Sequence, residues 1–149
     1  MSIADNIYSS LLSFGQANSF IVSFNDAQSV ARTWIERLGI RAIDGNARVI
    51  ELSGGNQQKV VIADALVQTP KLVIFDEPTR GVDVGAIAEI HDLINELADN
   101  GLAVLVISSY LPEIMGLSDR ILVSRLGRIV EEFSPASATE EKIMYAAVH

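Results

Sequence analysis

The chain has 149 residues, of which 49% are hydrophobic, so it is long enough to bury one sizeable core. Acidic residues outnumber basic ones by 19 to 11, and the net charge of -8 argues against a general nucleic-acid binder, because phosphate backbones are bound by clustered Lys and Arg. Cysteine is absent, which excludes disulfides and thiolate metal sites and is typical of cytosolic proteins. We expect no leader peptide, and the sequence contains no apolar run of the roughly twenty residues that a membrane helix needs.

Helical spacing marks the first part of the chain. Ile3, Ile7 and Leu11 recur at helical intervals, and an apolar cluster follows at residues 20–22. A second helix is expected to be capped at residues 25–26, to carry an apolar stripe on one face and to stop at Gly39. These segments predict helices without an evident chemical role.

Residues 52–59 read LSGGNQQK and have the features of a phosphate-binding helix start. Ser53 is a good N-cap for a helix that begins near Gly54. The first N–H groups of a helix lack partners within it and carry partial positive charge, so an anion is favoured there. Gly54 and Gly55 have no Cβ, which lets the main chain approach a phosphate closely. Taken alone, the same residues equally fit a plain Ser-capped helix after a Gly-Gly turn.

Residues 72–75 form a short apolar run between two prolines, which predicts a buried strand. Asp76 and Glu77 follow at its carboxyl end, where open α/β sheets bind their ligands. Adjacent strand residues point to opposite sides, so one carboxylate can hold a magnesium ion, usually through water, while the other polarises an attacking water. An isolated Asp-Glu pair would more simply be an acidic strand end that faces solvent.

The second half of the chain continues the α/β pattern. A helix is expected over residues 85–97, and residues 102–107 predict a parallel strand that is covered on both faces. Residues 121–130 predict a hairpin with Gly127 in its turn, and Thr139 can cap a last helix. His91 has no second ligand at metal-binding spacing, so no role is assigned to it.

Together these stretches resemble the ATP-binding cassette (ABC) ATPases over nearly the whole chain. LSGGN is similar to the family signature LSGGQ with Asn56 at its last place, LVIFDEPT resembles the Walker B strand with its glutamate, and Asp83 falls on the D-loop aspartate. The motifs GNQQK, RGVDVGA and SS-x-LPE resemble those in the second cassette of sugar-import ATPases of the ribose, galactose and xylose type.

The resemblance implies an α/β fold: a truncated P-loop NTPase core with a mostly parallel sheet, plus an α-helical subdomain. Residues 1–68 would form the helical subdomain with the signature motif, and residues 69–149 the C-terminal part of the nucleotide-binding core. The stretch that starts at Met1 resembles the middle of a cassette, and no G-x-x-x-x-G-K-[ST] phosphate loop (Walker A) occurs in the sequence.

The family's site residues map onto this chain one by one. By resemblance, Ser53, Gly54, Gly55 and Asn56 would bind the ATP that is held by a second cassette. Asp76 would hold Mg²⁺ through water, and Glu77 would be the catalytic carboxylate. The nucleotide contacts would be completed by Asp83 and Ser109.

Two positions depart from the family pattern. Ser109 stands where most members place a histidine that contacts the γ-phosphate, and serine can donate a hydrogen bond but cannot carry positive charge. Asp64 stands where an Arg or Lys is usual, which puts the local salt bridging in doubt.

The implied function is that of the ATPase subunit of an importer that couples ATP hydrolysis to sugar uptake, with ATP and Mg²⁺ as cofactors. Its implied partners are a second cassette, the membrane permease subunits and, indirectly, a periplasmic sugar-binding protein, at the cytoplasmic face of the membrane. We expect this chain alone to hydrolyse little ATP. One alternative is a non-catalytic module that docks on a permease or partner cassette, or forms a homodimer. Another, an ABC ATPase of DNA repair or translation, is disfavoured by the acidic balance, and no nucleic-acid partner is expected.

Overall fold

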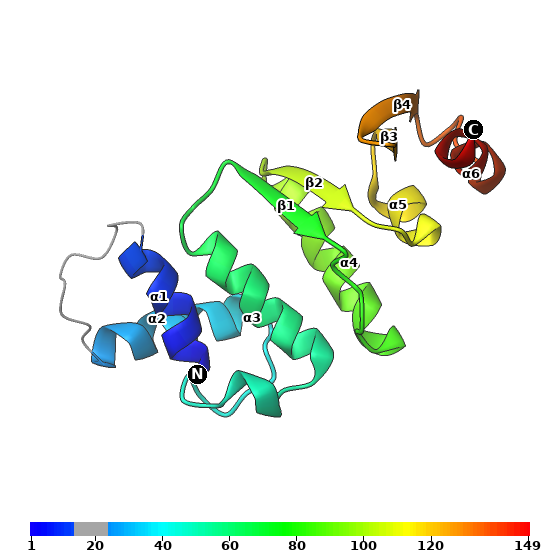
Figure 1. Cartoon of the computed structure of the whole chain (residues 1–149). Coiled ribbons are helices and arrows are strands. Elements are labelled where there is room, and N and C mark those ends of the chain that lie inside the picture. The colour runs from blue at the N-terminus through cyan, green and yellow to red at the C-terminus, as the bar shows by residue number, and fades with distance from the viewer. Residues whose placement is uncertain (14–23) are drawn as a thin grey trace. The chain divides into compact units, whose positions relative to one another are not determined.

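The computed structural model describes residues 1–13 and 24–149, and the apolar cluster expected at residues 20–22 lies outside this part (Figure 1). The chain forms two compact units: residues 1–73 with 79–104, and residues 74–78 with 105–149. The expected boundary between residues 68 and 69 stays a prediction.

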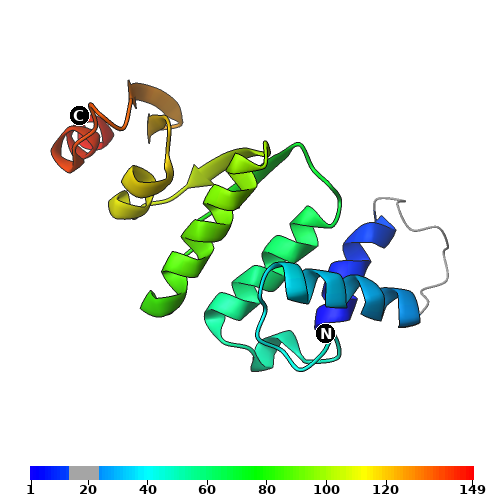
Figure 2. The same ribbon diagram turned by 180° about the vertical axis from the view of Figure 1, so that it is seen from behind.

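The first unit is mainly helical. Its elements are α1 (Ile3–Ser13), α2 (Phe24–Arg37), a short 3-10 turn (Val49–Glu51), α3 (Gly54–Leu66) and α4 (Val84–Asp99). Helix α1 packs against both α2 and α3, as the two opposite views agree (Figures 1 and 2). The predicted helices are therefore present.

The starts and ends of these helices follow from local chemistry. At α1, the Ser2 hydroxyl accepts a hydrogen bond from the Asp5 N–H, and the Asp5 carboxylate accepts one from the Ser2 N–H, which lowers the pKa of Asp5. Helix α2 begins at Phe24, so residues 25–26 lie in its first turn and the expected cap there is wrong. Its end is as predicted, because Gly39 adopts φ +58°, a left-handed conformation that suits glycine.

The core of the first unit is built from the predicted apolar stripes. Ile3, Ile7 and Ile90 are fully buried, and Trp34 is 8% exposed, with the Arg37 guanidinium over its ring. Helix α1 is further joined to α3 by the Ser10 hydroxyl, which donates a hydrogen bond to the Asp64 carboxylate. The unusual anion at position 64 is thus bound by a neutral donor.

Strands β1 (Leu72–Asp76) and β2 (Ala103–Ile107) pair with each other. The Ala103 N–H donates to the Lys71 carbonyl, and the Glu77 N–H donates to the Ile107 carbonyl, so the register advances in the same direction on both strands. The two strands are therefore parallel, as predicted.

The predictions of a buried strand at residues 72–75 and of a strand covered on both faces at residues 102–107 are wrong for this chain. Leu72 and Ile74 are 52% and 56% exposed, whereas Val73 between them is 7% exposed. On β2, Leu105 and Ile107 are also exposed. A strand is buried on both sides only when a layer packs on each face, and the described residues supply one such layer.

The second unit adds α5 (Leu111–Leu117), an antiparallel hairpin of β3 (Ile121–Arg125) and β4 (Arg128–Phe133), and α6 (Glu140–Val148). The hairpin turn is at Leu126 and Gly127, both with positive φ, as the glycine predicted. The Thr139 hydroxyl accepts a hydrogen bond from the Lys142 N–H and caps α6. Helix α6 packs on β3, and none of the helices in the described ranges is long and apolar enough to cross a bilayer.

Candidate functional site

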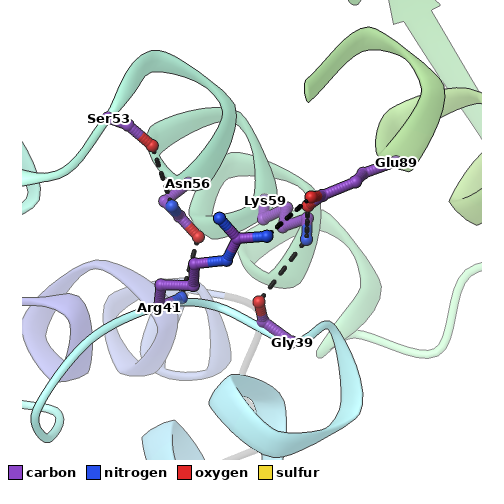
Figure 3. Close-up of polar contacts among 6 residues, drawn as sticks. All are labelled: Gly39, Arg41, Ser53, Asn56, Lys59 and Glu89. Carbon is purple, nitrogen blue, oxygen red and sulfur yellow. Dashed lines mark hydrogen bonds and ion pairs between the residues drawn. The ribbon is translucent and has the colours of Figure 1, made fainter. Parts of the chain in front are cut away.

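The first candidate region is the start of α3. Ser53 is the N-cap with extended backbone angles, and the helix begins at Gly54, as predicted. Among the described residues, however, the Ser53 hydroxyl accepts no hydrogen bond from the helix N–H groups. It accepts one instead from the Asn56 side-chain amide, at 2.8 Å (Figure 3). The carbonyl oxygen of that amide accepts a hydrogen bond from the Arg41 main-chain N–H, also at 2.8 Å.

The glycines of this helix start have a packing role that the sequence did not reveal. A Cβ on Gly55 would lie 2.5 Å from the Ala86 Cβ, a separation that real Cβ atoms do not show. A Cβ on Gly54 would lie 3.2 Å from the Gly81 carbonyl oxygen. The absence of side chains therefore lets α3 pack directly on residues 81–86, which include Asp83, the N-cap of α4.

An ion-pair cluster supports the same region from α4. Lys59 is 7% exposed, and its ammonium lies 2.8 Å from one carboxylate oxygen of Glu89 and donates to the Gly39 carbonyl. The Arg41 guanidinium lies 2.8 Å from the other oxygen of Glu89. The hydrogen bond from Lys59, and then the charges of Lys59 and Arg41, hold the pKa of Glu89 below its ordinary value. Sequence reasoning missed all three residues, although a lysine at a helix position that packs inward was a usable signal.

The second candidate region is the carboxyl end of β1, in the other unit. Glu77 has φ +50°, a left-handed conformation that is unusual for glutamate. Its N–H donates to the Ile107 carbonyl, and its carboxylate accepts a hydrogen bond of 3.0 Å from the Ser109 main-chain N–H. The Asp76 side chain is exposed. The two carboxylates are thus in different environments.

Metal binding at this end would rest on Asp76. The described residues contain no group of three or more His, Cys, Asp or Glu that could hold a metal ion. One exposed carboxylate fits Mg²⁺ nevertheless, because this ion keeps several waters and is usually bound through one or two carboxylates plus substrate phosphates.

The predicted site residues therefore fall into two groups. The structure brings Ser53, Gly54, Gly55 and Asn56 together with the 81–86 segment that includes Asp83 in the first unit. It brings Glu77 and Ser109 into contact in the second unit, where Asp76 lies beside Glu77 in the chain. The contact that Ser109 makes in the structure uses its main chain.

Comparison with solved structures defines the class of fold. The chain superposes on a solved ATP-binding cassette of an ABC transporter with a TM-score of 0.81 and 23% identity, over 100% of this chain and 63% of that one. A dimeric cassette in a post-hydrolysis state, bound to ADP and Pi, gives a TM-score of 0.73 and 24% identity over 91% of this chain and 57% of that one. The fold is that of a truncated ABC ATPase cassette, as predicted.

Sequence comparison then gives the family. The model of the ABC transporter family matches residues 1–80, and the chain belongs to this family. The ribose import ATP-binding protein of Caldanaerobacter subterraneus subsp. tengcongensis is 49% identical over 85% of this chain and 26% of that protein. The xylose import ATP-binding protein of Thermoanaerobacter pseudethanolicus is 48% identical over 99% of this chain and 29% of that protein. The chain thus spans less than a third of the length of these curated relatives.

Proposed function

We propose that the chain is part of the ATPase subunit of an ABC importer that couples ATP hydrolysis to sugar uptake. The relatives named for ribose and xylose import support the substrate class. The observation that carries the proposal is the start of the LSGGN helix, where Gly54 and Gly55 pack directly on residues 81–86. This chain would contribute the signature motif, the Walker B carboxylates and the D-loop.

The signature half-site would act on ATP held by a second cassette. Ser53, Gly54, Gly55 and Asn56 begin a helix whose first N–H groups have no intrahelical partner, and such groups bind phosphate oxygens. Asp83 would lie at the same nucleotide, because its segment packs on the two glycines.

The carboxylates at the end of β1 would serve this cassette's own nucleotide. Glu77 would polarise the attacking water, and its carboxylate is held by the Ser109 N–H, which leaves one oxygen to accept a proton. Asp76 would hold Mg²⁺ through water, and the bound ion would neutralise charge on the phosphates. Ser109 would contact the nucleotide with a neutral hydroxyl.

The proposed partners are a second cassette, the membrane permease subunits and, indirectly, a periplasmic sugar-binding protein. The site of action would be the cytoplasmic face of the membrane. Since the sequence contains no phosphate loop, we expect little ATP hydrolysis by this chain alone.

The test is Mg-ATP hydrolysis by the pure chain, with and without a complete cassette from the same importer. We expect background turnover by the chain alone, and turnover in the mixture that falls when the chain carries Ser53→Ala. Robust turnover by the pure chain, abolished by Glu77→Gln, would contradict the assignment of this chain as a half-site.

A non-catalytic interaction module is the second candidate, and the exposed faces of β1 and β2 favour it. Leu72, Ile74, Leu105 and Ile107 are all more than two-fifths exposed, and an apolar strand face of this kind favours self-association. Sedimentation equilibrium of the pure chain tests this candidate. A single monomeric mass would count against self-association.

A further inference from the structure

The orientation of the Asn56 side chain is fixed by its two neighbours. A main-chain N–H can only donate a hydrogen bond, so the atom of the Asn56 amide that faces the Arg41 N–H must be the oxygen. The amide nitrogen therefore faces the Ser53 hydroxyl oxygen, 2.8 Å away, and donates to it (Figure 3). The direction of both hydrogen bonds follows without any choice of side-chain flip.

This direction determines what Ser53 can donate. An N-cap serine ordinarily uses its oxygen to accept from the N–H of the second or third helical residue. Here Asn56, the third helical residue, supplies its side chain as the donor in place of its main chain. The main-chain N–H groups at the start of α3 are then not used by the cap, and the Ser53 hydroxyl hydrogen, on an exposed residue, is left to donate elsewhere.

The Arg41 end of this arrangement is anchored from α4. The Arg41 guanidinium and the Lys59 ammonium share the Glu89 carboxylate, each at 2.8 Å. Lys59 is buried, which fixes the position of Glu89, and Glu89 in turn limits the movement of the loop that presents the Arg41 N–H. The cluster thus holds in place the Arg41 N–H, which is one of the two contacts that orient Asn56.

We propose that Asn56 is a positioning residue, which makes the Ser53 hydroxyl and the first N–H groups of α3 into donors for one phosphate, and whose own side chain does not contact the nucleotide. This rests on the proposed function of the signature motif. It differs from the sequence-based expectation in the role given to Asn56. The proposal makes the effects of Asn56 and Ser53 on phosphate binding dependent on each other.

The test is a double-mutant cycle on the full chain, with inorganic tripolyphosphate as the probe at constant ionic strength. Amide shifts of Gly54 and Gly55 are followed by NMR in the wild type, Asn56→Ala, Ser53→Ala and the double variant. We expect saturable binding in the wild type, weakened about three- to tenfold by Asn56→Ala, the usual effect of one hydrogen bond. In the Ser53→Ala background, Asn56→Ala should have no further effect.

A second variant keeps the shape of the side chain. Asn56→Asp retains an acceptor for the Arg41 N–H but cannot donate to Ser53, so the serine hydroxyl turns to the new carboxylate. Gln58→Glu is the charge-matched control, because it adds the same charge in the same turn. We expect Asn56→Asp to weaken tripolyphosphate binding more than Gln58→Glu does. Equal effects would overturn the proposal.

The side-chain amide of Asn56 reports directly whether its hydrogen bond to Ser53 is present, whereas a merely structural bond would give no coupling in tripolyphosphate affinity. Its proton exchange should be slow in the wild type and faster in Ser53→Ala. Additive losses in the cycle, or an unchanged affinity in Asn56→Ala, would overturn the positioning role alone. An absence of any tripolyphosphate-dependent shift in the wild type would overturn both this role and the proposed signature half-site.

Discussion

We propose that residues at the start of α3 and at the carboxyl end of β1 both bind ATP. The two regions differ in how many hydrogen bonds and ion pairs from the chain hold these residues in place. At α3, Asn56 bonds to both Ser53 and Arg41, and the buried Lys59 pairs with Glu89. At β1, the carboxylate of Glu77 has one main-chain donor, and Asp76 is exposed. The first region is organised by the chain itself, whereas the second presents its charges to solvent.

This difference has a physical reason. A half-site that donates hydrogen bonds to another molecule's phosphates must hold its donors in place before the ligand arrives, because ordering them on binding costs free energy. Carboxylates that act through water and Mg²⁺ gain their partners only from the bound ligand. Substitutions should therefore affect folding stability at α3 and leave it nearly unchanged at the end of β1.

The largest expected effect is that of Gly55→Ala. The new methyl group would lie 2.5 Å from the Ala86 Cβ, so α3 and residues 81–86 must move apart. Overpacking of this kind costs about 1–3 kcal/mol, measured as the free energy of unfolding in urea. Gly85→Ala is the matched control, because a Cβ there meets nothing within 4 Å, and it should be neutral or stabilising. Equal effects of the two variants would refute the packing role of Gly55.

A smaller effect is expected for Glu77→Gln. The amide oxygen can still accept from the Ser109 N–H, but the charge assistance is lost, so the unfolding free energy should fall by about 1 kcal/mol or less. Hydrogen exchange of the Ser109 amide should become faster. Asp76→Asn is the control and should change neither quantity. A large loss in the control would show that Asp76 has a structural partner.

The next smaller effect is the pH dependence of stability that Glu89 confers. The pKa of Glu89 is lowered in the folded state by the hydrogen bond from Lys59 and by the nearby cations. The ionised Glu89 therefore stabilises the fold at pH values above the pKa that this carboxyl has in the unfolded chain. This stabilisation is lost as the pH falls through the lower folded value. The stability difference between wild type and Glu89→Gln should therefore shrink on acidification from about pH 7 to about pH 3. A constant difference would argue against the ionised cluster.

Arg41→Ala is the matched variant for that cluster. It removes the exposed guanidinium but keeps the main-chain N–H that binds Asn56. Because surface ion pairs contribute little, its effect on stability should be smaller than that of Glu89→Gln, and greater at low salt. An equal loss would show that Arg41, and not Lys59, is the main partner of Glu89.

Local signals in the sequence were enough for most elements. The Ser53 position at the start of α3, the turn at Gly127 and the cap at Thr139 are each decided by residues within a few positions, and the structure agrees. The cap of α2 was wrong by a residue or two, a usual uncertainty for helix ends.

Contacts distant in sequence could not be predicted. The partners Lys59 and Glu89 are 30 residues apart, and Glu77 and Ser109 are 32 apart, so only the packing of α3 on α4 and of β1 beside β2 brings them together. The strand faces were predicted to be buried because apolar runs indicate burial. Whether a layer covers each face depends on residues outside those runs.

We propose that the signature region of this chain binds ATP held by a second cassette. Sedimentation velocity of the chain mixed with a complete cassette of the same importer, with and without Mg-ATP, tests this binding. We expect association that requires ATP and is lost when this chain carries Ser53→Ala. Association that is equally strong without ATP, or unaffected by Ser53→Ala, would contradict the claim.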